Sequence, residues 1–278
     1  MNHVIGNGLY IMRKGLSMEA MFNKFQIHMP FSDLHDHYLP LVLEERLNPE
    51  ISFDYATLER FVIDDYRRIA DELLAAGLSV TFHAPFMDLR PGAIDPVIRK
   101  ASLDRIRSVV ELAAYFRPLA VVCHPSFDKR YYVSTEELWL ANSIETWKTL
   151  TAVAETVDTI LCLENVYEKQ PRMILRLLAA VESPRLSFCF DTGHFNVFSS
   201  VPLDEWMQAM APYLFELHIH DNGGAADEHL AAGNGSFPFF RLFGIIREKG
   251  LLPVMTLEAH KEATLRLSIE NLTAMGIL

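Results

Sequence analysis

The sequence predicts an α/β protein built as a (β/α)8 barrel, and three observations support this prediction. The chain has 278 residues, close to the roughly 250 of a typical barrel of this kind. Short apolar runs of strand length alternate with longer stretches of helical periodicity, which is typical of βα units and a parallel sheet. Six of the apolar runs end in His, Asp or Glu, where barrel enzymes carry their active sites.

The first βα units set the pattern. We expect the first strand at residues 24–29, followed by a turn at Pro30 and a helix that contains LPLVLEERL. The second strand is placed around residues 51–53. A helix is predicted over residues 56–76, because its apolar side chains recur with a period near 3.6 residues, and Gly77 ends it.

The remaining six units repeat this alternation. Asp95 is expected to cap the third helix, and Pro171 stands in the first turn of the fifth, where its missing N–H is harmless. Strands are predicted at residues 79–83, 119–124, 159–164, 186–191, 214–218 and 253–258. Helices are predicted at residues 96–116, 135–156, 171–181, from 204 onwards, at 237–249 and at 262–275. A long glycine-rich loop, residues 222–235, follows the seventh strand.

No linker, repeat or low-complexity segment divides the chain, so residues 23–278 are predicted to form one catalytic barrel domain. Residues 1–22 are interpreted as a disordered N-terminal extension. They lack the basic segment and long apolar run of a signal peptide. No segment approaches the roughly 18 uncharged apolar residues of a membrane helix, so no membrane partner is expected.

Charge and cysteine content limit the partners. The net charge of −11 argues against nucleic acid, because nucleic-acid-binding proteins usually carry a basic surface. The three cysteines, Cys123, Cys162 and Cys189, are far apart and show no CxxC spacing. We interpret them as reduced, buried thiols of a cytoplasmic protein. The sequence is compatible with a homo-oligomer and does not specify one.

Side chains that can hold a divalent metal end the last six predicted strands: His83, His124, Glu164, Asp191, His218 and Glu258. Three further candidates for metal or substrate contacts follow strand ends: His194, Asp227 and His229. This mixture of imidazole and carboxylate suits Zn²⁺, Mn²⁺, Co²⁺ or Fe²⁺ better than Ca²⁺.

Each of these residues also has an ordinary structural interpretation. Asp191 or Glu258 could cap a helix, Glu164 could form a structural ion pair, and His218 could be a satisfied core histidine. His83 and His124 could equally contact substrate or pack beside the ligands. Two neighbours are interpreted as supporting residues: Asn165 could orient the Glu164 carboxylate or merely form part of a turn, and His220 would lie behind the ligands or at the rim of the site.

Several of these segments resemble the xylose isomerase-like TIM-barrel superfamily, which includes sugar isomerases, sugar epimerases and the endonuclease IV family. The segments are LENV at Glu164, DTGH at Asp191 and His194, LHIHD at His218, DEH followed by GNG at Asp227 and His229, and TLE at Glu258. The resemblance covers about residues 79–258. The opening FNKFQIHMPFSDL differs from the glycine-rich opening of the endonuclease branch.

The resemblance implies a ligand set. A core metal would be held by Glu164, Asp191, His218 and Glu258. In the endonuclease branch, His83 and His124 would join Glu164 on a second metal. His194, Asp227 and His229 would hold a third. One ion is favoured here, and up to three are compatible with the ligands.

We therefore expect a divalent-metal-dependent isomerase or epimerase of a small sugar, sugar phosphate or polyol, acting through a metal-stabilised enediolate. Glu164 and Glu258 come from opposite sides of the barrel and would transfer the proton as the two catalytic residues. Two alternatives stay open. One is an endonuclease IV-like multinuclear zinc phosphodiesterase acting on abasic DNA, and the other is a non-catalytic barrel that binds metal or sugar.

Overall fold

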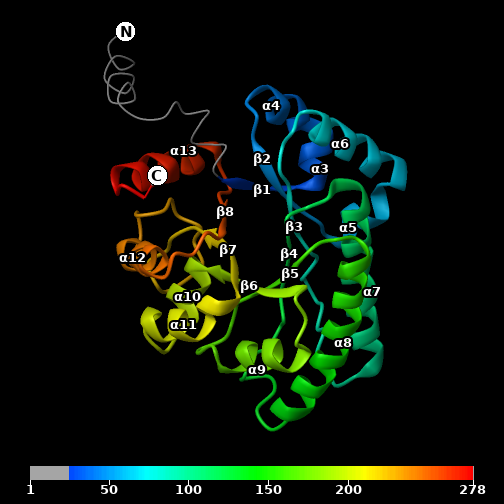
Figure 1. Cartoon of the computed structure of the whole chain (residues 1–278), viewed down its shortest axis with the longest axis vertical. Helices are drawn as coiled ribbons and strands as arrows, with labels where there is room; N and C mark the ends of the chain where they lie inside the picture. Colours follow the sequence, from blue (N-terminus) through cyan, green and yellow to red (C-terminus); the bar gives the residue numbers. More distant parts are fainter. Residues whose placement is uncertain (1–24, 278) are drawn as a thin grey trace.

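The computed structural model describes residues 25–277 and contains a closed barrel of parallel strands in chain order (Figure 1). β1 pairs with β8, which closes the ring and confirms the predicted (β/α)8 fold. The strands are β1 (Gln26–Pro30), β2 (Asn48–Ser52), β3 (Thr81–His83), β4 (Val121–Cys123), β5 (Leu161–Glu164), β6 (Leu186–Asp191), β7 (Leu214–Ile219) and β8 (Val254–Leu257).

Helices surround the barrel (Figure 1). They are α3 (Phe31–Asp33), η2 (Leu34–Tyr38), α4 (Leu39–Glu44), α5 (Tyr55–Arg60), α6 (Ile63–Ala75), α7 (Pro96–Phe116), α8 (Glu136–Thr156), α9 (Arg172–Val181), α10 (Thr192–Phe198), α11 (Leu203–Met210), η3 (Ala211–Tyr213), α12 (Phe239–Lys249) and α13 (Glu262–Ala274). Asp95 accepts the backbone N–H of Val97 at the start of α7, which confirms the predicted cap.

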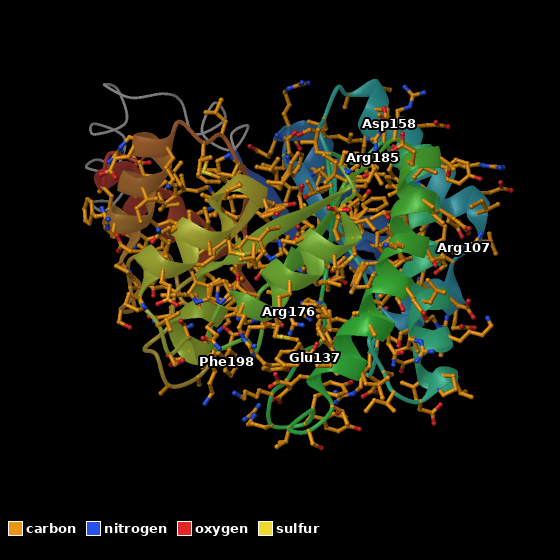
Figure 2. The ribbon with its side chains drawn as sticks, turned by 60° about the horizontal axis from the view of Figure 1, so that its bottom comes forward. Arg107, Glu137, Asp158, Arg176, Arg185 and Phe198 are labelled. Atoms are coloured by element: carbon orange, nitrogen blue, oxygen red, sulfur yellow. The ribbon has the colours of Figure 1, made fainter. Side chains whose placement is uncertain are left out.

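Apolar packing holds the helices against the strands. Phe188 and Phe190 of β6 pack against Trp206 of α11, and Trp139 and Trp147 of α8 are fully buried. Ion pairs join the outer surfaces of neighbouring helices. Nη2 of Arg176 on α9 lies 2.7 Å from Oε2 of Glu137 on α8, and Figure 2 shows these two residues beside each other. Exposed pairs of this kind contribute little stability, so the helical layer depends on burial.

The structure corrects the first two units. β1 begins at Gln26 rather than at residue 24, and residues 1–24 lie outside the described part of the chain. β2 starts three residues earlier than predicted, at Asn48. The predicted helix 56–76 is two helices, because the chain is extended at Phe61. The Phe61 ring packs edge-on against Phe31, 5.0 Å between centroids, and this burial outweighs helical propensity.

A further helix was not predicted. α10 follows β6 without a loop, because the Asp191 carboxylate accepts the backbone N–H of His194 and caps the new helix. The capping interpretation of Asp191 is therefore correct, and it does not exclude a role in a metal site.

One other expectation, that the cysteines are buried thiols, agrees with the structure. The three cysteines are free and buried. Within residues 25–277, no helix has the length and apolar character needed to cross a membrane.

Candidate metal centre

The ends of β5 to β8 bring the four predicted core ligands around one point. Nδ1 of His218 lies 3.5 Å from Oε1 of Glu164 and 3.9 Å from Oδ2 of Asp191. The same nitrogen lies 3.2 Å from Oε1 of Glu258. Register explains the convergence, because Asp191 of β6 pairs directly with His218 of β7. Four residues from four strands therefore share one small volume.

Two buried polar atoms at this point have no hydrogen-bond partner in the described structure, and a bound cation would be a partner for both. Nδ1 of His218 and Oε1 of Glu164 are buried and have no hydrogen-bond partner in the described structure. Buried polar atoms are normally hydrogen bonded. Burial would lower the pKa of His218, but the Cys189 thiol and the carboxylates around the ring raise it well above its usual value. The residues present therefore fit a divalent metal ion held by nitrogen and oxygen ligands.

A second group of ligands lies on the other side of Glu164. Its Oε2 is 3.3 Å from Nε2 of His83 and 2.9 Å from Nε2 of His124. Nδ1 of His83 lies 2.9 Å from the carbonyl oxygen of Ala84, which can only accept a hydrogen bond. In the neutral ring Nε2 is then unprotonated and faces the carboxylate. Burial lowers the pKa of His83, but the contact with Glu164 raises it above its usual value, so either a proton or a metal ion is favoured between Nε2 and the carboxylate.

The long loop after β7 brings Asp227 and His229 to His194 of α10, and these three residues form the third group. Oδ2 of Asp227 lies 3.4 Å from Nε2 of His194 and 3.5 Å from Nδ1 of His229. His229 also approaches Glu258, 3.5 Å from Nε2 to Oε2. The loop therefore connects the outer imidazoles to a core carboxylate.

Asp221 fixes the shape of this loop. Its carboxylate accepts the backbone N–H groups of Gly233, Gly235 and Phe237, at 3.0, 2.8 and 3.1 Å. Gly233 has a φ of +84°, and a Cβ at Gly235 would lie 2.2 Å from the carbonyl oxygen of Asn222. These contacts explain both glycines of the GNG segment in physical terms.

His220 is fully buried and does not lie at the rim. Its Nε2 is 2.9 Å from Oδ2 of Asp191, so it supports that carboxylate from behind. A Cβ at Gly193 would lie 2.0 Å from the His220 ring, which explains the glycine of the DTGH segment. Of the two interpretations of Asn165, the structure does not support orientation of the Glu164 carboxylate. The Asn165 amide exchanges hydrogen bonds with the backbone of Asp191 and not with the Glu164 carboxylate.

Sequence reasoning missed Glu50 and His28. Glu50 of β2 is fully buried, and its oxygens lie 2.9 Å from Nδ1 of His28 and 3.1 Å from Nε2 of His218. The pKa of Glu50 is about 2, because contacts with His218 and His28 outweigh the opposing effect of burial. Glu50 is a charged residue inside a barrel strand, which would have indicated a functional role. The predicted second strand begins only at residue 51, after Glu50.

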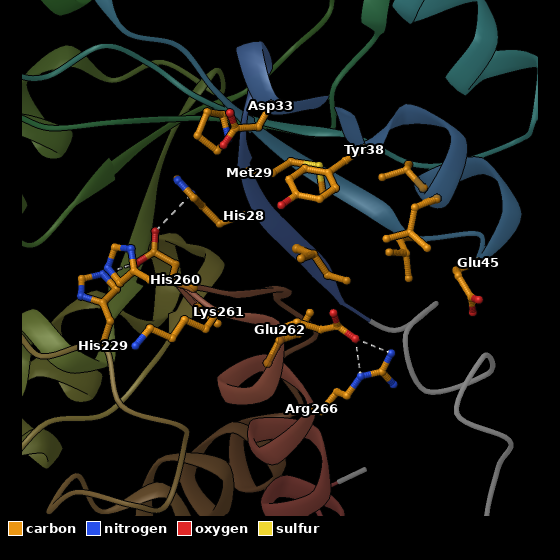
Figure 3. Close-up of a pocket in the computed structure, with 18 residues that line it drawn as sticks. His28, Met29, Asp33, Tyr38, Glu45, His229, His260, Lys261, Glu262 and Arg266 are labelled. Atoms are coloured by element: carbon orange, nitrogen blue, oxygen red, sulfur yellow. Dashed lines mark hydrogen bonds and ion pairs between the residues drawn. The ribbon is translucent and has the colours of Figure 1, made fainter. Parts of the chain in front are cut away.

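A pocket of about 570 Å³ opens beside the cluster between β1, β8 and the first helices. His28, His229 and Glu258 line its inner end, together with the exposed His260 and Lys261. Figure 3 shows Tyr38 and Glu45 on the opposite wall. Its volume lies in the range of small-molecule sites.

Comparisons with known proteins place the chain in a family. An uncharacterised protein of Methanocaldococcus jannaschii is 28% identical over 188 residues, 65% of this chain and 64% of that protein. A probable endonuclease 4 of Mesomycoplasma hyopneumoniae is 25% identical over 194 residues, 64% of this chain and 67% of that protein. Fructoselysine 3-epimerase of Shigella flexneri is 27% identical over 173 residues, 59% of this chain and 60% of that protein.

Solved structures agree with the fold. A D-tagatose 3-epimerase-like protein superposes with a TM-score of 0.77 at 21% identity, covering 91% of this chain and 98% of that one. A Thermus thermophilus protein soaked with ZnCl2 gives 0.74 at 27% identity, covering 91% and 99%. The xylose isomerase-like TIM barrel profile matches residues 45–275. The chain therefore belongs to the xylose isomerase-like TIM barrel family.

Proposed function

We propose that this protein is a divalent-metal-dependent isomerase or epimerase of a small sugar, sugar phosphate or polyol. The observation that carries the proposal is the convergence of Glu164, Asp191 and Glu258 on the unpartnered Nδ1 of His218. These four residues would hold one divalent ion, Zn²⁺, Mn²⁺, Co²⁺ or Fe²⁺. When bound, the ion supplies Lewis-acid polarisation of a substrate carbonyl. The adjacent pocket has the size of a small-molecule site.

The two glutamates would transfer the proton. The Glu258 side chain is 10% exposed and lines the pocket, so it is placed to remove a proton beside a carbonyl. Glu164, whose side chain is 1% exposed, comes from β5 on the other side of the ring and would return a proton. Burial would raise the pKa of both carboxyls, but neighbouring histidines hold these pKa values well below the usual range. Both groups are thus ionised, so Glu258 can accept the proton, and Glu164 would deliver a different proton that it first takes up from solvent.

Solvent exchange tests this proposal across a panel of candidate substrates. Ketoses, aldoses and their phosphates are incubated in D2O with the Zn²⁺-, Mn²⁺- or Co²⁺-loaded protein, and loss of a C–H proton signal is followed by NMR. Glu258→Gln is expected to lower exchange by roughly 10²–10⁴-fold while the protein stays folded. Glu262→Gln, at the exposed end of the same pocket, is the matched control. Full exchange in Glu258→Gln would contradict the proposal.

Metal content tests the ligand assignment separately. Asp191→Ala is expected to lose the core ion, and elemental analysis of the purified variant measures this loss. An unchanged metal-to-chain ratio would exclude Asp191 as a ligand.

A second candidate is a multinuclear phosphodiesterase, and one observation favours it. Both oxygens of Glu164 are approached by imidazoles, with His83 and His124 on Oε2, an arrangement suited to a carboxylate that bridges two ions. The net charge of −11 argues against DNA as its substrate. Hydrolysis of bis(p-nitrophenyl) phosphate or of an abasic oligonucleotide, with about three Zn²⁺ per chain, would establish this candidate. One ion per chain with C–H exchange and no hydrolysis would exclude it.

A further inference from the structure

Glu50 is a buried carboxylate to which neither the proposed reaction nor the expected ligand set gives a role. It lies in the middle of β2, fully buried, directly opposite His28 in the β1–β2 pairing. Its Oε2 lies 3.1 Å from Nε2 of His218, and its Oε1 lies 2.9 Å from Nδ1 of His28. Burial of a carboxylate in such a position costs folding free energy unless each of its oxygens accepts a hydrogen bond or faces a positive charge. Here each oxygen faces an imidazole, and the Glu216 carboxyl group lies within 4.8 Å as well.

The contact with His218 determines which ring nitrogen faces the core carboxylates. An ionised carboxylate only accepts hydrogen bonds, so Nε2 of His218 donates to Glu50. A bound metal ion would replace a proton on Nδ1 and bind the lone pair of this atom, which lies within 3.9 Å of three carboxylate oxygens. A carboxylate behind a ligand histidine fixes the tautomer and the ring orientation, and it raises the basicity of the ligand atom.

The contact with His28 extends the same anchor toward the pocket. The His28 side chain is 29% exposed and lines the pocket (Figure 3), and its Nδ1 also lies 3.5 Å from Oε1 of Glu258. Glu50 therefore sits between one imidazole that faces the ion position and one that faces the pocket.

We propose that Glu50 is a positioning residue: it presents Nδ1 of His218 to the metal ion and holds His28 beside Glu258 at the inner end of the pocket. The proposal rests on the metal centre of the proposed function and is independent of the reaction catalysed there. It adds β1 and β2 to the strands that build the site, which the sequence placed on β3 to β8.

Glu216 provides a matched control for this role. It is as buried as Glu50 and lies two residues before His218 on β7. Its Oε1 accepts the hydroxyl of Thr256 at 2.7 Å. Its carboxyl group lies within 4.8 Å of Glu50 and His218, so it shares their surroundings, but no hydrogen bond between it and an imidazole is found among the described residues. Replacing it tests the effect of losing a buried carboxyl group that does not hold the His218 ring.

The test compares Zn²⁺ affinity of the full chain, measured by chelator competition, in wild type, Glu50→Gln and Glu216→Gln. A glutamine cannot accept from both imidazoles, so Glu50→Gln is expected to bind Zn²⁺ about 10–100-fold more weakly. Co²⁺-loaded Glu50→Gln is expected to show an altered visible spectrum. Glu216→Gln should retain wild-type affinity and spectrum. Wild-type Zn²⁺ affinity in a folded Glu50→Gln variant would overturn the proposal, and so would an equal loss in Glu216→Gln.

A second measurement uses the wild-type protein and is needed if Glu50→Gln does not fold. In the Zn²⁺-loaded protein, ¹⁵N-resolved histidine NMR is expected to show His218 bound to metal through Nδ1, with a slowly exchanging proton on Nε2. Metal bound through Nε2, or a rapidly exchanging Nε2 proton, would refute the role of Glu50. Neither measurement requires turnover, so failure of the isomerase proposal leaves this result unaffected.

Discussion

Glu168 should make the stability of this protein depend on pH, and replacing it should remove that dependence. It follows β5 in the loop beside the metal centre and is 5% exposed. Its Oε2 accepts the backbone N–H of Val166 at 2.8 Å, but Oε1 is buried without a hydrogen-bond partner in the described structure. Burial raises the pKa of Glu168 to about 7 from 4.5, against the smaller lowering effect of the backbone hydrogen bonds.

The magnitude follows from the two pKa values. One pKa unit corresponds to about 1.4 kcal/mol, so a carboxyl moved from 4.5 to about 7 costs the folded state roughly 3 kcal/mol once it is fully ionised. The direction of the change in unfolding free energy with pH follows from proton binding. The folded state holds the proton more tightly, so this stability is fully present below pH 4.5 and is lost as pH rises through about 7. Between pH 5 and pH 8 the loss is about 2.5 kcal/mol.

Urea denaturation of the metal-free protein measures the effect. The free energy of unfolding is compared at pH 5 and pH 8 for wild type, Glu168→Gln and the control Glu145→Gln, an exposed residue of α8. Other titrating groups are common to all three proteins and cancel in the comparison. Glu168→Gln should lose about 2.5 kcal/mol less than wild type over this range. Parallel pH dependence in wild type and Glu168→Gln would refute the reasoning.

Three further predictions concern the residues that support the site. Gly193→Ala would place a Cβ 2.0 Å from the His220 ring, and should lower the free energy of unfolding in urea by about 1–3 kcal/mol; unchanged stability would contradict this contact. Asp221→Asn replaces one of the two oxygens that accept backbone N–H groups by an NH2 donor, and should speed limited proteolysis within residues 222–236, mapped by mass spectrometry. Adding Zn²⁺ to EDTA-treated protein at 100 times its Kd should stabilise it by about 2.7 kcal/mol, seen as a higher Tm in calorimetry.

Local sequence signals determined most of the fold. β6 and α7 begin and end where the apolar pattern and the Asp95 cap predict. The errors occur where distant residues decide the local structure. Phe61 leaves the helical conformation because its ring is buried against Phe31, far earlier in the chain. The second helix then starts through a local contact, in which the carboxylate of Asp65 accepts the N–H of Val62. Neither contact has a periodic signal.

The candidate site was predictable to the extent that it uses strand ends. In a parallel barrel the carboxyl ends of all strands meet on one face, so acidic and imidazole residues at those ends must converge. The geometry brings together all nine side chains selected on that basis, with each one within 3.5 Å of a carboxylate or imidazole of another. Their roles as ligands stay a prediction.

Glu50 lies within a strand and not at its end, so its place in the site could not be predicted in this way. A carboxylate in mid-strand is unfavourable in a barrel interior unless it is partnered, and its partner His218 lies 168 residues later in the chain. The pair forms only when β1 and β2 close against β7 and β8. The same closure brings Glu164 and Glu258 to the other nitrogen of that ring. We therefore expect metal affinity and closure of the barrel to be coupled through His218, so that a variant that loosens either should weaken both.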